Sequence, residues 1–296
     1  MISPKVSEKI YQIIFTIFAF TSLSFLIGIT LTLFKEGLPV FGEVSLGEFI
    51  FGRDWHPTYE PPDLGILPLI SGTLWIMIGA LIVCVPLGIG SALYLHELAG
   101  VEEKAVLKPT IELLAGIPSI VYGFFGMVIV APFIRELLDI PVGLCVFTAS
   151  LILGVMAVPT VCSIAEDALH CVPQSFREAS FALGANRWQT LTRVVIPCAG
   201  SGISTAVILG MSRIVGETMT VLMVAGGAAI IPKSFFQPAR PMTATIAGEM
   251  GEAIMGSVHY HALFAIGLIL FLITLLLNGV AELISRRYRI RLGLGI

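Results

Sequence analysis

Charged residues are scarce in this 296-residue sequence, which contains 17 Lys and Arg and 20 Asp and Glu. Only 12% of the residues carry charge, against about 25% in an average soluble domain. Hydrophobic residues make up 56%, which is more apolar surface than a soluble fold can bury while covering itself with polar groups. The composition therefore excludes intrinsic disorder and a nucleic-acid binder with a basic face.

Paired cysteines and a nucleotide-binding loop are also absent. The five cysteines include no Cys-x-x-Cys pair, which excludes a disulfide-stapled module and favours small buried hydrophobes over metal ligands. His259 and His261 have H-x-H spacing, but they lie at a predicted membrane edge without a carboxylate partner. We therefore predict interfacial histidines and no metal site. No G-x-x-x-x-G-K-S/T loop is present, so the chain is not predicted to bind ATP in that way.

Long apolar stretches dominate what is there. Six of them can cross a bilayer, which takes about 20 residues, and backbone pairing in lipid requires each to be a helix. They cover residues 10–33, 69–95, 113–134, 142–162, 203–224 and 261–284. The predicted fold is therefore an all-α polytopic membrane protein with six transmembrane helices.

The distribution of Lys and Arg predicts the orientation of these helices. With both termini in the cytoplasm, eleven of the 17 basic residues fall in internal segments and five in external ones, as the positive-inside rule requires. We expect a first helix with an external loop over residues 1–68, a transmembrane domain over 69–284, and a cytoplasmic basic tail over 285–296.

An internal loop over residues 172–197 is predicted to form two short helices. Ser175 and Glu178 have the spacing of a capping box, which satisfies free N–H groups at a helix start. Asn186 and Gln189 offer the same device for a second helix.

Gly184 suits the left-handed position that ends the first of these helices, and Pro197 marks the entry to the fifth span. Such a loop exposes apolar side chains, which need a protein partner or a place on the bilayer surface; the residues alone leave both open. These side chains are Phe176, Phe181, Leu183 and Trp188.

Two charges fall inside the predicted fifth span. Arg213 lies about ten residues from its start, near the middle of the membrane, where a lone arginine costs on the order of 3 kcal/mol. Glu217 is one helical turn further and is expected to pair with it. The pair either serves transport or tightens helix packing, and we favour transport because intramembrane charges are usually functional.

The internal loop resembles the EAA loop of ABC importer permeases, in which E-A-A is followed by a glycine and then I-x-L-P. Here the corresponding residues are Glu178-Ala179-Ser180, Gly184 and Pro197. The resemblance implies a MetI-like permease fold and a coupling helix that docks on a separate ATPase. It also implies that this chain has no catalytic residues or cofactors of its own.

The string Ser212-Arg-Ile-Val-Gly-Glu-Thr218 is similar to the R-x-x-G-E-T signature of phosphate importer permeases, and other passages resemble the PstC type. Those passages are residues 55–57, 65–74, 112–123, 244–253 and 259–264. The resemblance implies a multi-pass protein of the plasma (inner) membrane that encloses a phosphate path with a second, homologous permease. Two cytoplasmic ATP-binding subunits would drive it, and an external phosphate-binding protein would deliver the anion.

Other functions remain open at this point. A PstA-type permease or an importer of molybdate or sulfate has the same class of sequence. An ion-coupled secondary transporter would be expected to show internal repeats, which are not seen. In a membrane receptor or scaffold, Arg213 and Glu217 would be a packing pair. Glu249 and Glu252, before the sixth span, could line an outer mouth, but we expect them in a solvated loop.

Overall fold

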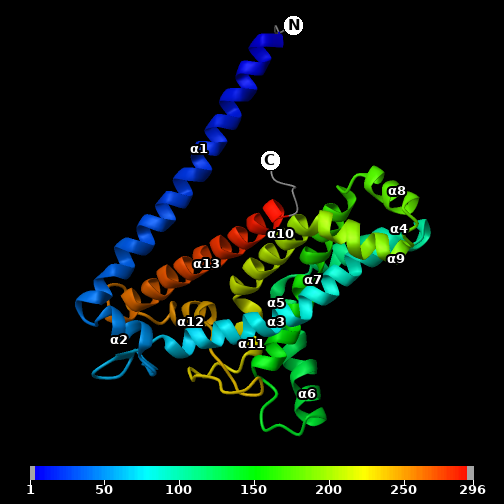
Figure 1. The fold of residues 1–296 in the computed structure, drawn as a ribbon. Coiled ribbons are helices and arrows are strands. Elements are labelled where there is room, and N and C mark those ends of the chain that lie inside the picture. Colours follow the sequence, from blue (N-terminus) through cyan, green and yellow to red (C-terminus); the bar gives the residue numbers. More distant parts are fainter. Residues whose placement is uncertain (1–3, 292–296) are drawn as a thin grey trace.

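The computed structural model describes residues 4–291, and helices account for most of them (Figure 1). Six helical segments are long and apolar enough to cross a membrane, which confirms the predicted number of spans. They are Tyr11–Gly42, Leu67–Leu98, Ser119–Leu137, Val146–His170, Arg187–Val215 and Val258–Leu283. Residues 292–296 of the predicted basic tail lie outside the described residues, and 285–291 form the end of the last helix.

The elements follow one another in chain order. The first half contains α1 (Pro4–Gly37), η1 (Leu38–Gly42), α2 (Leu46–Phe51), β1 (Trp55–His56), β2 (Asp63–Leu64), α3 (Leu67–Leu93), η2 (Tyr94–Leu98), α4 (Val101–Ala115), α5 (Ser119–Phe125), η3 (Gly126–Val130) and α6 (Ala131–Leu137). The second half contains α7 (Val146–His170), α8 (Gln174–Ala182), α9 (Arg187–Thr190), η4 (Leu191–Val195), α10 (Ile196–Val215), α11 (Met219–Val224), α12 (Met242–Glu249) and α13 (Val258–Arg291). Strands β1 and β2 pair antiparallel and form a small hairpin.

The observed spans differ from the predicted bounds: the first runs on to Gly42 and the fourth to His170, and in the third and the fifth a break in the helix accounts for the difference. The third was expected from residue 113, but the chain breaks between α4 and α5, and the span starts at Ser119 after Pro118. A proline disfavours helical geometry in the residue before it, which accounts for the break. The fifth was expected over 203–224, but its helix begins near Arg187 and ends at Val215 before Gly216. Residues 219–224 instead form the separate helix α11.

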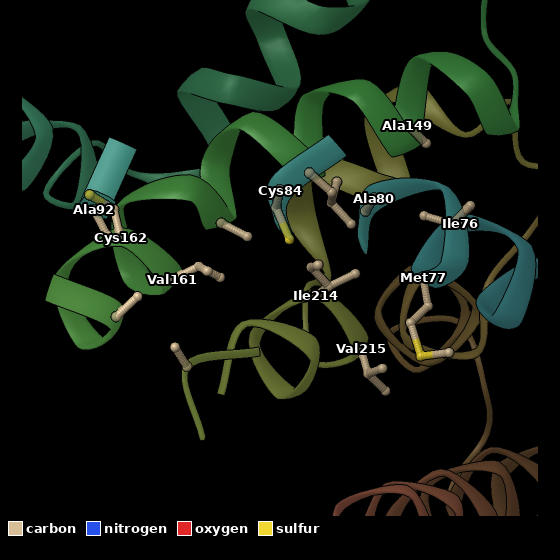
Figure 2. Close-up of a cluster of buried hydrophobic side chains, with 14 of the residues drawn as sticks. Ile76, Met77, Ala80, Cys84, Ala92, Ala149, Val161, Cys162, Ile214 and Val215 are labelled. Carbon is tan, nitrogen blue, oxygen red and sulfur yellow. The ribbon is translucent and has the colours of Figure 1, made fainter. Parts of the chain in front are cut away.

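The core is formed where α3 and α7 approach closely. A Cβ built on Gly154 of α7 would lie 2.6 Å from Val83 Cβ of α3, so only glycine permits this contact. Figure 2 shows Cys84 of α3, Val161 and Cys162 of α7 and Ile214 of α10 around one buried interior. All five cysteines are free, and Cys84, Cys145 and Cys162 are buried, as small hydrophobes are.

Among the described residues, helix α1 meets the rest of the chain only near its C-terminal end. There a Cβ on Gly37 would lie 3.1 Å from the backbone of Ala265 in α13, and His261 contacts the Glu36 carbonyl at 2.7 Å. Figure 1 shows α1, in blue, running away from the bundle toward the N-terminus. Its apolar side chains between Tyr11 and Leu31 are exposed, so this surface faces lipid or a second protein.

Candidate transport path and coupling surface

The helix of the fifth span ends after α10, and α11 starts a new helix after three intervening residues. The two charges predicted to lie in the membrane are at this interruption. Arg213 lies in the last turn of α10, and Glu217 lies beyond Gly216, where the helix has ended. The Glu217 carboxylate accepts a hydrogen bond from the backbone N–H of Thr220 at 3.3 Å. Glu217 therefore caps α11. The predicted pairing with Arg213 is wrong, because Gly216 interrupts the helical turn that would have aligned the two side chains.

Arg213 is exposed on this chain, and the packing of α10 on α7 shows its level in the bundle. Gly202 of α10 packs against Ala168, near the C-terminal end of α7, and a Cβ on Gly210 would lie 2.6 Å from Val161. Three residues further, Arg213 is therefore level with the middle of α7. Within residues 4–291 the guanidinium makes no hydrogen bond or ion pair at up to 4.0 Å, although it is close enough to interact electrostatically with Tyr122 of α5.

Neighbouring elements fix the geometry of the break. The Thr243 hydroxyl of α12 donates to the Glu217 carbonyl at 2.8 Å. The Thr220 hydroxyl of α11 donates to the Ser119 carbonyl of α5 at 2.9 Å, so the first turns of these two short helices lie together. Irregular backbone at membrane depth is tolerated only where it is buried in protein or lines a cavity. Pro118 and Gly216 are the sequence signals that could have located both breaks.

The internal loop forms the two predicted helices, with one of the two predicted caps. Asn186 and Gln189 make the reciprocal capping box of α9, with distances of 2.9 and 2.8 Å, which confirms that prediction. The box of Ser175 and Glu178 is wrong, because α8 already begins at Gln174 after Pro173, whose φ of -57° suits a helix start. Gly184 has φ +82°, the left-handed conformation predicted for it.

The first loop helix is attached to the C-terminal end of the second span. Arg177 of α8 donates to the Glu97 carboxylate of η2 at 2.5 Å, and both side chains are mostly buried. The Ser180 and Thr190 hydroxyls join α8 to α9 at 2.9 Å. Pro197 lies in the first turn of α10, after a wide helical turn over η4. It therefore falls within the fifth span, which begins at Arg187, and does not mark the entry to the span as predicted. A displacement of α8 would therefore be passed to both α3 and α10.

One face of α8 and α9 is exposed and contacts no other part of the described chain. Glu178 and Ala179 are exposed, and four large apolar side chains are exposed beside them. The exposed fractions are 44% for Phe176, 46% for Phe181, 90% for Leu183 and 70% for Trp188. These are the side chains for which the sequence left a protein partner and the bilayer surface open.

An ion-pair cluster near the C-terminal end of α7 was not predicted from the sequence. Glu166, in α7 and almost fully buried, contacts Lys104 and Lys108 of α4 at 2.9 Å each. The two lysines are one turn apart, and the carboxylate raises the pKa of Lys108 above its usual value. A single glutamate in an apolar span, with an i, i+4 lysine pair elsewhere, is the signal that could have found this cluster.

Removing this cluster should loosen α4. We expect Glu166→Ala to lower the stability of the purified protein by about 1–2 kcal/mol, because two lysines then lose a buried partner and each is partly solvated. Thermal unfolding in detergent measures the change, with Glu102→Ala on the exposed face of α4 as a control. Equal unfolding temperatures for the two variants would contradict the role assigned to Glu166.

At the opposite end from the loop helices, a cavity of about 420 Å³ lies among the hairpin, α11, α12 and the start of α13. Glu249 lies in its wall and accepts hydrogen bonds from Arg240 at 2.6 Å, from Trp55 at 3.1 and 3.2 Å, and from His259 at 3.0 Å. Glu249 therefore lies in the hydrogen-bonded wall of the cavity and not, as predicted, in a solvated loop. His259 was predicted to lack a carboxylate partner, but it pairs with Glu249. Among the described residues no group of three or more metal-ligating side chains is arranged to hold an ion.

The sequence of this chain is similar to one family of membrane transport proteins and to several of its named members. Residues 84–290 match the family described as binding-protein-dependent transport system inner membrane component. A probable ABC transporter permease protein YqgH of Bacillus subtilis is 38% identical over 94% of this chain and 91% of its own length. The phosphate transport system permease protein PstC of Mesorhizobium japonicum is 35% identical over 90% and 86%, and that of Pasteurella multocida is 34% identical over 81% and 79%.

Solved structures share the fold. A bacterial alginate ABC transporter aligns with a TM-score of 0.67 at 15% identity, over 94% of this chain and 96% of its own. The MetNI methionine ABC transporter aligns with a TM-score of 0.56 at 20% identity, over 76% and 94%. These likenesses confirm the predicted all-α, MetI-like permease fold. The chain is therefore an ABC importer permease that belongs to the binding-protein-dependent transport system inner membrane component family, with its sequence relatives among the PstC-type permeases.

Proposed function

We propose that this chain lines the path of inorganic phosphate in an ATP-driven importer, together with a second, homologous permease. The observation that carries the proposal is Arg213. Its guanidinium is level with the middle of α7, exposed on the chain, and without a hydrogen bond or ion pair in residues 4–291. A cation in that position is costly unless it serves an anion or a partner.

The chemistry of arginine suits phosphate. Its planar fork donates two parallel hydrogen bonds to an oxyanion, which a lysine ammonium does not. Glu217 does not block these donors, because its carboxylate is engaged in capping α11. The identity of the anion is supported by the PstC relatives at 34–35% identity, and sulfate or molybdate is the alternative that the experiment separates.

The partners follow from uncovered surfaces. The exposed apolar residues of α8 and α9 fit a groove on a cytoplasmic ATP-binding subunit better than water, and two permeases would engage two such subunits. The exposed surface of α1 and the face of α10 that carries the exposed Arg213 would contact the second permease or the lipid bilayer. An external phosphate-binding protein would deliver to the end of the bundle that carries the hairpin. In this arrangement ATP hydrolysis belongs to the partner subunits.

The test is transport by the reconstituted assembly. The chain is co-expressed with its candidate partners and placed in proteoliposomes that contain ATP. Uptake of radiolabelled phosphate that requires ATP and the binding protein supports the proposal. Uptake of sulfate or molybdate in place of phosphate would overturn the substrate but keep the transporter class, and transport by this chain alone would overturn the class.

Orientation is tested separately. Thr58, beside the outer cavity, and Gln189, on α9, lie at opposite ends of the bundle and are both exposed. In intact cells a cysteine at Thr58 should react with a membrane-impermeant thiol reagent, and a cysteine at Gln189 should react only after permeabilisation. The reverse pattern would contradict the cytoplasmic placement of the loop and of both termini.

A further inference from the structure

The cavity at the outer end combines a cationic donor with a carboxylate that has no partner. Arg240 and Glu252 both line it. Arg240 uses Nε on the Gly227 carbonyl at 2.7 Å and Nη1 on Glu249 at 2.6 Å, and its Nη2 makes no hydrogen bond in residues 4–291. Glu252 is exposed, and within the same residues its carboxylate makes no hydrogen bond or ion pair.

Glu249 holds the arginine in place, and the ion pair between these two side chains is formally neutral. Three donors from three different segments converge on its carboxylate: Trp55 of the hairpin, Arg240 before α12, and His259 at the start of α13. Trp55 is only 3% exposed, so this wall is packed and not a loose surface cluster. The groups left to meet a solute are the free edge of Arg240 and the Glu252 carboxylate.

We propose that this cavity is a binding site for a protonated oxyanion, in which Arg240 donates to the charged oxygens and Glu252 accepts the ligand's O–H. An ionised carboxylate can only accept hydrogen bonds, so it is satisfied by a ligand that still carries a proton. Near neutral pH inorganic phosphate keeps one or two protons, whereas sulfate keeps none. Glu252 therefore stabilises phosphate and repels sulfate, and the proton stays on the phosphate throughout.

The location of the cavity suits a binding site that the anion occupies before it reaches Arg213. Val221 and Leu222 of α11 lie in the cavity wall, and the other end of α11 is capped by Glu217 at the break. The six residues of α11 span only about 9 Å. This inference rests on the proposed phosphate transport and names the feature of the permease that would recognise the anion before Arg213 does.

The test is ligand protection of a cysteine in the cavity. Thr58 lines the cavity and is exposed, and Thr58→Cys is combined with Cys171→Ser, since Cys171 is the exposed native cysteine. The complete transporter, without binding protein, is labelled in right-side-out vesicles with an impermeant maleimide. Phosphate at ten times its dissociation constant should slow labelling about tenfold, by simple mass action. Sulfate at the same concentration should leave the rate unchanged.

Two substitutions assign the roles. Arg240→Gln should abolish protection by phosphate, and Arg240→Lys should restore part of it. Glu252→Gln should allow sulfate to protect, because the amide also donates. Lys233→Gln and Glu60→Gln, exposed changes of the same kind outside the cavity, should behave as the parent does. Absence of phosphate protection in the parent, equal protection by sulfate, or unchanged protection in Arg240→Gln would each overturn the inference.

A second measurement separates the proposed transport function from the proposed cavity site. ATP-driven phosphate uptake is measured on the same Thr58→Cys transporter, now with the binding protein present. Uptake without protection would overturn the cavity site and leave the proposed function intact. Uptake of sulfate only, with no phosphate uptake, would overturn the proposed function. Sulfate protection of the parent cavity would then overturn the protonated-ligand inference independently.

Discussion

Arg213→Gln is expected to lower ATP-driven phosphate uptake by about 10- to 100-fold while the protein still inserts and still binds its ATPase. Glutamine keeps hydrogen-bond donors but loses the charge and the two-pronged fork, and a hydrogen bond to a charged group contributes about 1.5–3 kcal/mol. Arg213 makes no hydrogen bond or ion pair within residues 4–291, so the change removes no internal contact of that kind. Uptake and co-purification are compared at equal membrane levels.

The control is Arg135→Gln, because Arg135 is exposed on α6, away from both the break at Gly216 and the loop helices. Its uptake should stay close to that of the parent. Glu217→Gln should have a smaller effect than Arg213→Gln, since an amide oxygen can still cap α11. Recovery of uptake in the double variant Arg213→Gln with Glu217→Gln would mean that the two charges compensate each other after all, and would remove Arg213 from the path.

Gly184→Pro is expected to abolish coupled uptake by disconnecting the loop from its ATPase. Gly184 has φ +82°, which proline cannot adopt, and its N–H donates to the Phe181 carbonyl at 2.9 Å, a bond that proline lacks. Both losses change the pose of α8, the helix that carries the exposed Phe176. The measurements are ATPase co-purification and the ratio of phosphate transported to ATP hydrolysed.

Gly184→Asn is the matched control, because asparagine tolerates the left-handed conformation and keeps the N–H. It should retain most of the uptake. Charge reversal at Glu178, which is exposed on α8, should weaken ATPase binding, whereas reversal at Glu102 on α4 should not. Normal coupling in Gly184→Pro, or equal effects at Glu178 and Glu102, would contradict the assignment of this loop as the docking surface.

The site was only partly predictable from local signals. The Asn186 and Gln189 cap and the turn at Gly184 depend on neighbours within a few residues, and both are observed. The prediction that Arg213 pairs with Glu217 was wrong, because it assumed an unbroken helix through Gly216. Hydropathy continues across that glycine, so an apolar window gives no sign of the interruption.

Six apolar helices and a loop of two short helices could be predicted from the order of the residues, because length, hydropathy and caps are local properties of the chain. Two contacts depend on the folded chain and have no local signal. Thr220 of α11 donates to the Ser119 carbonyl of α5, and Glu249 accepts hydrogen bonds from both Trp55 and His259. The partners in these contacts are separated by 10 to 194 residues. Their selection depends on how whole helices pack, and small residues such as Gly154 allow that packing only where the facing helix brings a matching surface.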